Sequence, residues 1–168
     1  MKRIAIQDAN ILIDLVQTGL FDYCLALQYQ FTTTEIILNE LYDEQVALIQ
    51  PHISSGKFII IEITATELTA IQLLSLEDTR LSEQDWSAVY YAQQKEALLL
   101  SGDKQLRGLA KLKGLTVHGI FWLMDQLVDT DILSKTEACS FLKDLISKNK
   151  RLPAVECERR IILWCNSK

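Results

Sequence analysis

The order of apolar and polar residues along the chain predicts short strands that alternate with longer helices. Short runs rich in apolar and β-branched residues indicate strands, whereas apolar residues spaced three or four positions apart indicate helices. Such an alternation favours a mostly parallel sheet that is covered by helices on both faces. The predicted strands cover residues 3–7, 29–33, 57–63, 97–101 and 115–119. The predicted helices cover residues 8–19, 20–28, 34–45, 65–76, 82–96, 103–114, 120–128, 134–149 and 154–165.

The last part of the chain carries helical patterns but no strand pattern. A length of 168 residues fits one domain with a core large enough to fold alone. We therefore predict that residues 1–129 form the α/β domain and that residues 130–168 form a helical C-terminal extension of the same domain.

The charge and the cysteine content of the chain limit the classes of protein to which it can belong. The net charge of −5 argues against a broad, sequence-blind nucleic-acid surface, although a local basic rim is compatible with it. The four cysteines are widely spaced and neither histidine has metal-ligand spacing, so we expect free, buried thiols in a reducing compartment. No apolar run reaches the ~18 residues of a membrane span, and the first residues do not resemble a signal peptide. We expect a cytoplasmic protein.

Two acidic residues follow predicted strands directly. Asp8 comes after the first strand, and Asp103 comes two residues after Ser101, where the fourth strand ends. Ligands of open α/β sheets bind at the carboxyl ends of the strands, which makes both residues candidates for a site. Aspartate is also a favoured helix N-cap, and a helix is predicted to begin at each position. Both interpretations stay open.

Two further carboxylates lie on predicted helices, in register with apolar faces. Glu40 extends a stripe begun by Ile36 and Ile37, and Asp85 precedes Val89 on an inward face. The structural alternatives are a stripe edge that reaches solvent for Glu40 and favourable interaction with the helix dipole for Asp85.

If Asp8, Glu40, Asp85 and Asp103 converge, a cation is the natural counterpart. Two carboxylates ~5 Å apart repel each other by roughly 3 kcal/mol at an effective dielectric constant of ~20. Ligand sets made only of oxygen atoms favour hard ions such as Mg²⁺ or Mn²⁺. A site with two such ions can stabilise both the attacking and the leaving oxygen of a phosphodiester displacement.

Four stretches of the sequence together resemble the PIN-domain family, which includes the VapC-type toxin ribonucleases. The resemblance implies a three-layer α/β/α fold with a short, mostly parallel sheet, and a metal-dependent ribonuclease activity. The stretches are "IQDANILIDL" (6–15), "TTTEIILNELYDE" (32–44), "LSEQDWSAVYYAQQ" (81–94) and "LLLSGDKQLRGLAKLKGLTVHGIFWLMDQLV" (98–128).

The resemblance also assigns roles residue by residue. The acidic positions of the family fall on Asp8, Glu40, Asp85 and Asp103, which would be both catalytic and metal-binding, and its supporting polar positions fall on Asn10 and Ser101. The sequence departs from the family at Ile120, where a Thr is common, and in its longer C-terminal extension.

Contact with RNA requires positive charge near these acids. Lys104, Arg107 and Lys111 share one face of the helix that Asp103 begins, and we predict that they bind RNA; an ordinary solvated face is the alternative. A second basic cluster, "SKNKR" (147–151), is interpreted as a solvated helix end.

The leading functional hypothesis is therefore a Mg²⁺- or Mn²⁺-dependent endoribonuclease that hydrolyses RNA phosphodiesters and acts as the toxin of a toxin–antitoxin pair. Its expected partners are the RNA substrate, an antitoxin protein, and further copies of the chain in a homodimer or higher homo-oligomer. The first alternative is a non-catalytic RNA- or partner-binding module on the same fold. A phosphoacceptor signalling domain is disfavoured, because no adjacent acidic pair follows the first strand.

Overall fold

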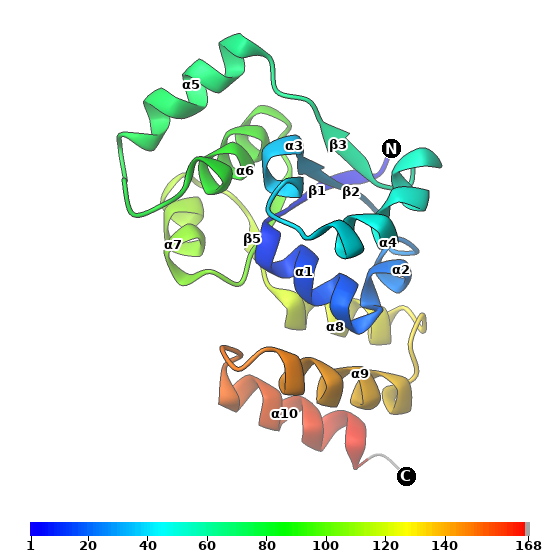
Figure 1. Cartoon of the computed structure of the whole chain (residues 1–168). Helices are drawn as coiled ribbons and strands as arrows, with labels where there is room; N and C mark the ends of the chain where they lie inside the picture. Colours follow the sequence, from blue (N-terminus) through cyan, green and yellow to red (C-terminus); the bar gives the residue numbers. More distant parts are fainter. Residues whose placement is uncertain (167–168) are drawn as a thin grey trace.

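A five-stranded parallel sheet forms the centre of the protein in the computed structural model, which describes residues 1–166 (Figure 1). The strand order is β3-β2-β1-β4-β5, and every neighbouring pair is parallel. The strands are β1 (Arg3–Gln7), β2 (Tyr29–Thr34), β3 (Ile59–Ile61), β4 (Leu98–Leu100) and β5 (Val117–His118).

Helices cover both faces of this sheet, which confirms the predicted α/β/α architecture. One apolar cluster packs the first face under α1 (Ala9–Thr18), α2 (Leu20–Cys24), α4 (Asp43–Ser54) and α8 (Ile120–Asp129). A second cluster packs the other face under α3 (Glu35–Leu38), α5 (Ala65–Ser75), α6 (Glu83–Gln94) and α7 (Lys104–Leu112). Among residues 1–166, no helix has the length and apolar character that crossing a membrane requires.

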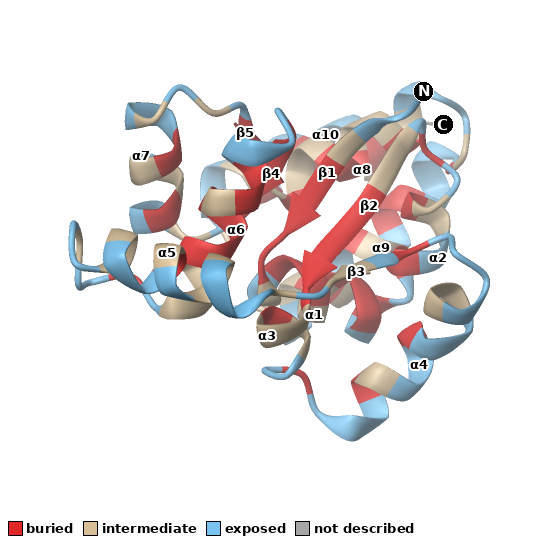
Figure 2. Cartoon of the chain, turned by 90° about the horizontal axis from the view of Figure 1, so that it is seen from above, coloured by how far each residue is buried: buried red, intermediate tan, exposed pale blue. Residues whose placement is uncertain are grey.

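The central strands carry apolar residues where both of their faces are buried (Figure 2). In β4, Leu98 and Leu100 join the first cluster, whereas Leu99 joins the second. Polar residues are buried at the strand ends: β2 ends in Thr32, Thr33 and Thr34, and β1 ends in Gln7, whose amide has no hydrogen-bond partner among the described residues.

The C-terminal helices α9 (Lys135–Lys148) and α10 (Ala154–Cys165) lie together beside α1 and α8 (Figure 1). The buried Arg160 of α10 donates two hydrogen bonds to Asp125 of α8, at 2.9 and 2.6 Å. Its guanidinium also lies 4.6 Å from the ring centre of Phe121. The expected helical extension is thus present up to residue 166, while residues 167–168 lie outside the described part. A domain boundary at residue 129 stays a prediction.

The single helix predicted over residues 34–45 is wrong. α3 ends at Leu38, and the N–H groups of Glu40 and Leu41 then bond carbonyls three residues back, at 3.0 and 3.1 Å. Tyr42 is extended, and its N–H donates to Gln45 Oε1 at 2.9 Å, which starts a separate helix, α4. The sequence did not indicate α4 beyond residue 45, because Pro51 interrupts its pattern.

The prediction of four free thiols is wrong for two of them. Cys139 of α9 and Cys165 of α10 form a disulfide across a sequence separation of 26 residues, with Cα atoms 5.2 Å apart. Their spacing in the sequence gave no sign of this, because only the packing of α9 on α10 brings them together. Cys24 and Cys157 are free and buried, as expected, and burial raises the pKa of the Cys24 thiol.

Candidate functional site

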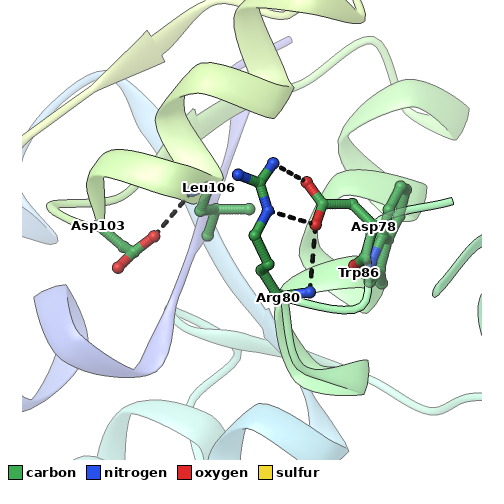
Figure 3. A network of polar contacts seen from close by, with 5 residues as sticks. All are labelled: Asp78, Arg80, Trp86, Asp103 and Leu106. Carbon is green, nitrogen blue, oxygen red and sulfur yellow. Dashed lines mark hydrogen bonds and ion pairs between the residues drawn. The ribbon is translucent and has the colours of Figure 1, made fainter. Parts of the chain in front are cut away.

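Two acidic residues cap helices at the carboxyl edge of the sheet. Asp8 follows β1, and its Oδ1 accepts the N–H of Ile11 in α1 at 2.9 Å. Asp103 follows β4, and its Oδ1 accepts the N–H of Leu106 in α7 at 2.8 Å (Figure 3). Because β1 and β4 are parallel neighbours, the two helix starts lie at the same edge. The N-cap interpretation is therefore correct for both residues, and it is compatible with a role in a site.

Ser101 joins the Asp8 carboxylate to the backbone of Asp103 through its side chain. The Ser101 hydroxyl donates a hydrogen bond to Oδ2 of Asp8. Oγ of Ser101 also accepts the backbone N–H of Asp103 at 3.1 Å. Ser101 is fully buried and Asp8 is only 3% exposed, so this contact is shielded from water. The supporting position predicted for Ser101 thus lies between two of the predicted acids.

The charges at this edge influence one another. Burial, reinforced by the negative charges of Asp85 and Asp103, raises the pKa of Asp8 to about 7 against the opposing hydrogen bonds from Ser101 and Ile11. Partial burial, and then the charge of Asp85, raise the pKa of Glu40. The charges of Asp85 and Asp103 therefore act on Asp8, and the charge of Asp85 acts on Glu40.

Asp85 is placed by the first turn of α6. Its carboxylate accepts the N–H of Ser82 at 3.0 Å, and its own N–H donates to Ser82 Oγ at 3.1 Å, which completes a capping box. The fully buried Trp86 holds this turn in place, because its indole N–H donates to the carbonyl of Asp78 at 3.2 Å. The Arg80 guanidinium binds both oxygens of Asp78 and holds the pKa of that carboxyl at about 2 (Figure 3).

Glu40 does not lie on a helix, where the sequence pattern predicted it. It lies in the turn after α3 and is exposed, so it does not extend a buried helical stripe. The turn itself is anchored near the sheet, because Thr34 caps α3 and its hydroxyl contacts Ser87 of α6 at 2.9 Å.

The chemistry of these side chains fits a hard divalent cation. All the groups are oxygen donors without Cys or His, which is the set that Mg²⁺ and Mn²⁺ prefer. A cation would also offset the cost of ionising the buried Asp8 carboxyl. Within residues 1–166, however, no three such side chains form a closed metal cluster, and Asp8, Asp85 and Asp103 each accept a helix-capping hydrogen bond instead. The assignment of these residues as ligands stays a prediction.

A cleft of about 940 Å³ opens beside Asp103 and contains part of the predicted RNA-binding face. Lys104, Arg107 and the exposed Asn10 line it, whereas Lys111 lies further along α7 outside its walls. Arg107 Nη1 donates to the carbonyl of Ser101 at 2.9 Å. A side chain at Gly119 would place its Cβ 3.1 Å from this nitrogen, so glycine leaves room for the arginine.

Sequence reasoning missed the opposite wall of this cleft. The α9–α10 loop contributes Lys150 and Arg151, which belong to the basic cluster interpreted above as a solvated helix end. The positive charge of "SKNKR" was the only available signal, and it does not reveal which part of the molecule the loop faces. Ile120, where the family often has Thr, is buried in the first turn of α8.

An α/β/α sandwich with carboxylates at the carboxyl edge of a parallel sheet is the arrangement expected of a PIN-like protein. A family model described as "DUF3368: PIN domain" matches residues 4–164, and the chain belongs to this family. PIN domains are generally nucleases and generally use divalent metals, so the chain is a nuclease-type module.

A comparison with solved structures agrees on the fold. The protein is similar to PAE2754 from Pyrobaculum aerophilum, with a TM-score of 0.51 and 19% sequence identity over 76% of this chain and 99% of that one. At this identity the likeness concerns the fold alone. No curated protein matches the sequence significantly.

Proposed function

We propose that the protein is a Mg²⁺- or Mn²⁺-dependent endoribonuclease that hydrolyses RNA phosphodiesters. The observation that carries the proposal is the electrostatic coupling of Asp8, Asp85 and Asp103 at the sheet edge, with Asp8 almost fully buried. A buried carboxyl whose pKa is raised by burial and by neighbouring carboxylates is typical of sites that bind a cation or carry out a reaction.

The residues of the chain supply position and charge for this reaction. Asp8, Glu40, Asp85 and Asp103 would hold the ions. When bound, the ions lower the pKa of the attacking water and neutralise charge on the leaving oxygen. Ser101 fixes Asp8 against the backbone of Asp103, so that two of the ligands keep a constant separation.

The substrate and the biological role are further parts of the proposal. Lys104 and Arg107 are cations beside Asp103 and would bind the phosphates of RNA, with Lys111 extending the contact along α7. The resemblance to VapC-type ribonucleases supports a toxin that is controlled by an antitoxin protein and that forms a homodimer or higher homo-oligomer.

The decisive experiment replaces Asp103 by Asn. Asn caps a helix about as well as Asp but carries no negative charge. We expect Asp103→Asn to keep the fold, to show a smaller rise in thermal midpoint on addition of Mn²⁺, and to lose cleavage of single-stranded RNA. The smaller rise follows because stabilisation by a ligand depends on its concentration relative to its dissociation constant.

The controls are wild-type protein with Mn²⁺ and wild-type protein with EDTA, which should abolish cleavage. If Mn²⁺ raised the thermal midpoint equally in wild type and Asp103→Asn, and both cleaved RNA equally, the role of Asp103 as a ligand would be contradicted. Tight RNA binding by the wild type with no cleavage in Mg²⁺ or Mn²⁺ would instead favour a non-catalytic RNA-binding module.

A further inference from the structure

The cleft beside Asp103 is built from distant parts of the chain. One wall includes the starts of α1 and α7, with Asn10, Lys104 and Arg107, and the segment 118–122 at the start of α8 also lines the cleft. The other wall is the end of α9 and the α9–α10 loop, residues 148–153. Its volume of about 940 Å³ is near the upper end of the range of about 300–1,000 Å³ that is typical of ligand sites. The cleft therefore extends the candidate active site toward the C-terminal helices.

The loop that forms the second wall is attached firmly to the nuclease domain. Asn149 Nδ2 donates to Oδ2 of Asp14 in α1 at 2.8 Å, and its Oδ1 accepts the N–H of Arg151 at 2.9 Å. Lys148 Nζ donates to the carbonyl of Gln17, also in α1, at 2.8 Å. These contacts fix the position of the loop relative to α1, which Asp8 begins.

Four cations without an acidic partner line this cleft. Within residues 1–166, no carboxylate forms an ion pair with Lys104, Arg107, Lys150 or Arg151. The acidic residues that line the cleft interact mostly with residues other than these four cations.

Each lining acid away from Asp103 has its own partner. Asp14 accepts a hydrogen bond from Asn149, and Glu156 pairs with Arg160. In a chain of net charge −5, the cleft therefore has four cations that are available to an anionic ligand.

We infer that this cleft binds the phosphate backbone of the RNA strand that leads to the cleaved bond, with Lys150 and Arg151 of the α9–α10 loop opposite Lys104 and Arg107. The inference rests on the proposed function and adds the C-terminal helices to the substrate site. Proteins that hold single strands use a positively charged groove that follows the backbone. Arginine is suited to phosphate because its planar guanidinium can donate two parallel hydrogen bonds.

The position of the cleft favours a polynucleotide over an acidic peptide. Asp103 lines it, so the cleft leads to the predicted metal-binding edge of the sheet. A strand of RNA must pass along such a cleft if one of its phosphodiesters is to reach that edge, whereas an acidic peptide has no group for the proposed reaction. Arg107 marks the junction, because it lines the cleft and is bonded to Ser101, which contacts both Asp8 and Asp103.

The test removes the two loop cations from the full chain. The variant Lys150→Ala/Arg151→Ala is compared with the control Lys143→Ala/Arg159→Ala, which removes the same charges from exposed positions on α9 and α10 outside the cleft. Binding of a labelled, short, single-stranded RNA is measured in EDTA at several salt concentrations, so that cleavage does not interfere.

We expect the cleft variant to bind RNA at least about tenfold more weakly than the control at low salt. The slope of log Kd against log salt should fall by about 1.4, at about 0.7 per lost phosphate contact with a single strand. Equal affinities and equal slopes in the two variants would overturn the inference.

Two further measurements separate this inference from the proposed function and from a peptide ligand. The Mn²⁺-induced rise in thermal midpoint should be the same in the cleft variant and in the wild type, because the loop cations do not contact the carboxylates. Polyuridylate should displace the labelled RNA, whereas polyglutamate of equal charge should not. Equal displacement by polyglutamate would identify an acidic-peptide site and contradict the inference.

Discussion

The carboxylates at the end of the sheet and the carboxylates on the surrounding helices are held in different ways. Asp8 and Asp103 directly follow neighbouring strands and share Ser101, so that the sheet fixes both of them. Asp85 depends on a capping box with Ser82, and Glu40 lies exposed in a turn. The comparison indicates that the sheet preorganises the strand-end pair, whereas the positions of Asp85 and Glu40 depend on local contacts of a helix start and a turn.

The largest expected effect is a pH dependence of stability that comes from the strand-end pair. In metal-free protein the pKa of Asp8 is raised from 3.8 to about 7, so the native state binds more protons than the unfolded state between these values. The free energy of unfolding should therefore fall as the pH rises from about 4 to about 7, by up to about 4 kcal/mol from this group.

Urea unfolding in EDTA across this pH range measures the effect. Asp8→Asn should remove most of the slope, whereas Glu40→Gln, which changes an exposed carboxyl, should leave most of it. Burial also raises the pKa of Asp14, but that contribution is common to all three proteins. Parallel slopes in wild type and Asp8→Asn would show that Asp8 does not titrate in this window.

The next effect compares the two classes of carboxylate in catalysis. Even residues that only support a metal ligand typically change affinity or activity by 10- to 100-fold, so Asp8→Asn should reduce Mn²⁺-dependent RNA cleavage by at least about 100-fold. Glu40→Gln should reduce it less, by about tenfold. Cleavage rates at saturating Mn²⁺ test this order, and a larger loss for Glu40→Gln would reverse the comparison.

Ser101 offers a way to weaken the preorganised pair without removing a charge. Ser101→Ala deletes the hydrogen bond to Asp8 and the acceptor for Asp103, and should weaken Mn²⁺ binding by about tenfold or more. The matched control is Thr18→Val, which removes a buried hydroxyl at the far end of α1 that donates to the carbonyl of Asp14 at 2.7 Å. A Mn²⁺ titration followed by thermal midpoint should distinguish the two, and an unaltered affinity in Ser101→Ala would argue against preorganisation.

The smallest effect concerns Gln7, the residue immediately before Asp8. Leaving a buried amide without partners costs about 1–3 kcal/mol, so Gln7→Met should raise the free energy of unfolding by about 1 kcal/mol. Gln45→Met should instead lower the free energy of unfolding, because the side chain of the buried Gln45 accepts a hydrogen bond from the N–H of Tyr42. Urea unfolding of both variants measures the difference, and destabilisation by Gln7→Met would mean that the amide has a partner such as a bound water.

The strand-end carboxylates could be predicted from sequence because their position follows from local order. A parallel sheet places the residue after each strand at one edge, so finding the strands was sufficient to group Asp8 with Asp103. The alternating faces of β4 were equally predictable, because three consecutive leucines require burial on both sides.

Features that depend on tertiary packing could not be predicted in the same way. The apolar residues at 36–38 match a long helix as well as a short one, and the turn that contains Glu40 is set by the Gln45 contact to Tyr42. The place of "SKNKR" in the cleft depends on how the C-terminal helices dock on α1, which no short stretch of sequence specifies.

Because of the disulfide between Cys139 and Cys165, the covalent structure of the protein depends on the redox conditions in which it is prepared. Closing a loop of 26 residues lowers the entropy of the unfolded chain, which corresponds to roughly 3–4 kcal/mol of stability in the simplest loop model. In a reducing compartment the same pair exists as two thiols, and α10 then loses its covalent link to α9 but keeps its packing and the hydrogen bonds from Arg160 to Asp125. Preparations made with and without a thiol reductant are therefore two covalently different molecules, and amide hydrogen exchange in α10 should differ between them.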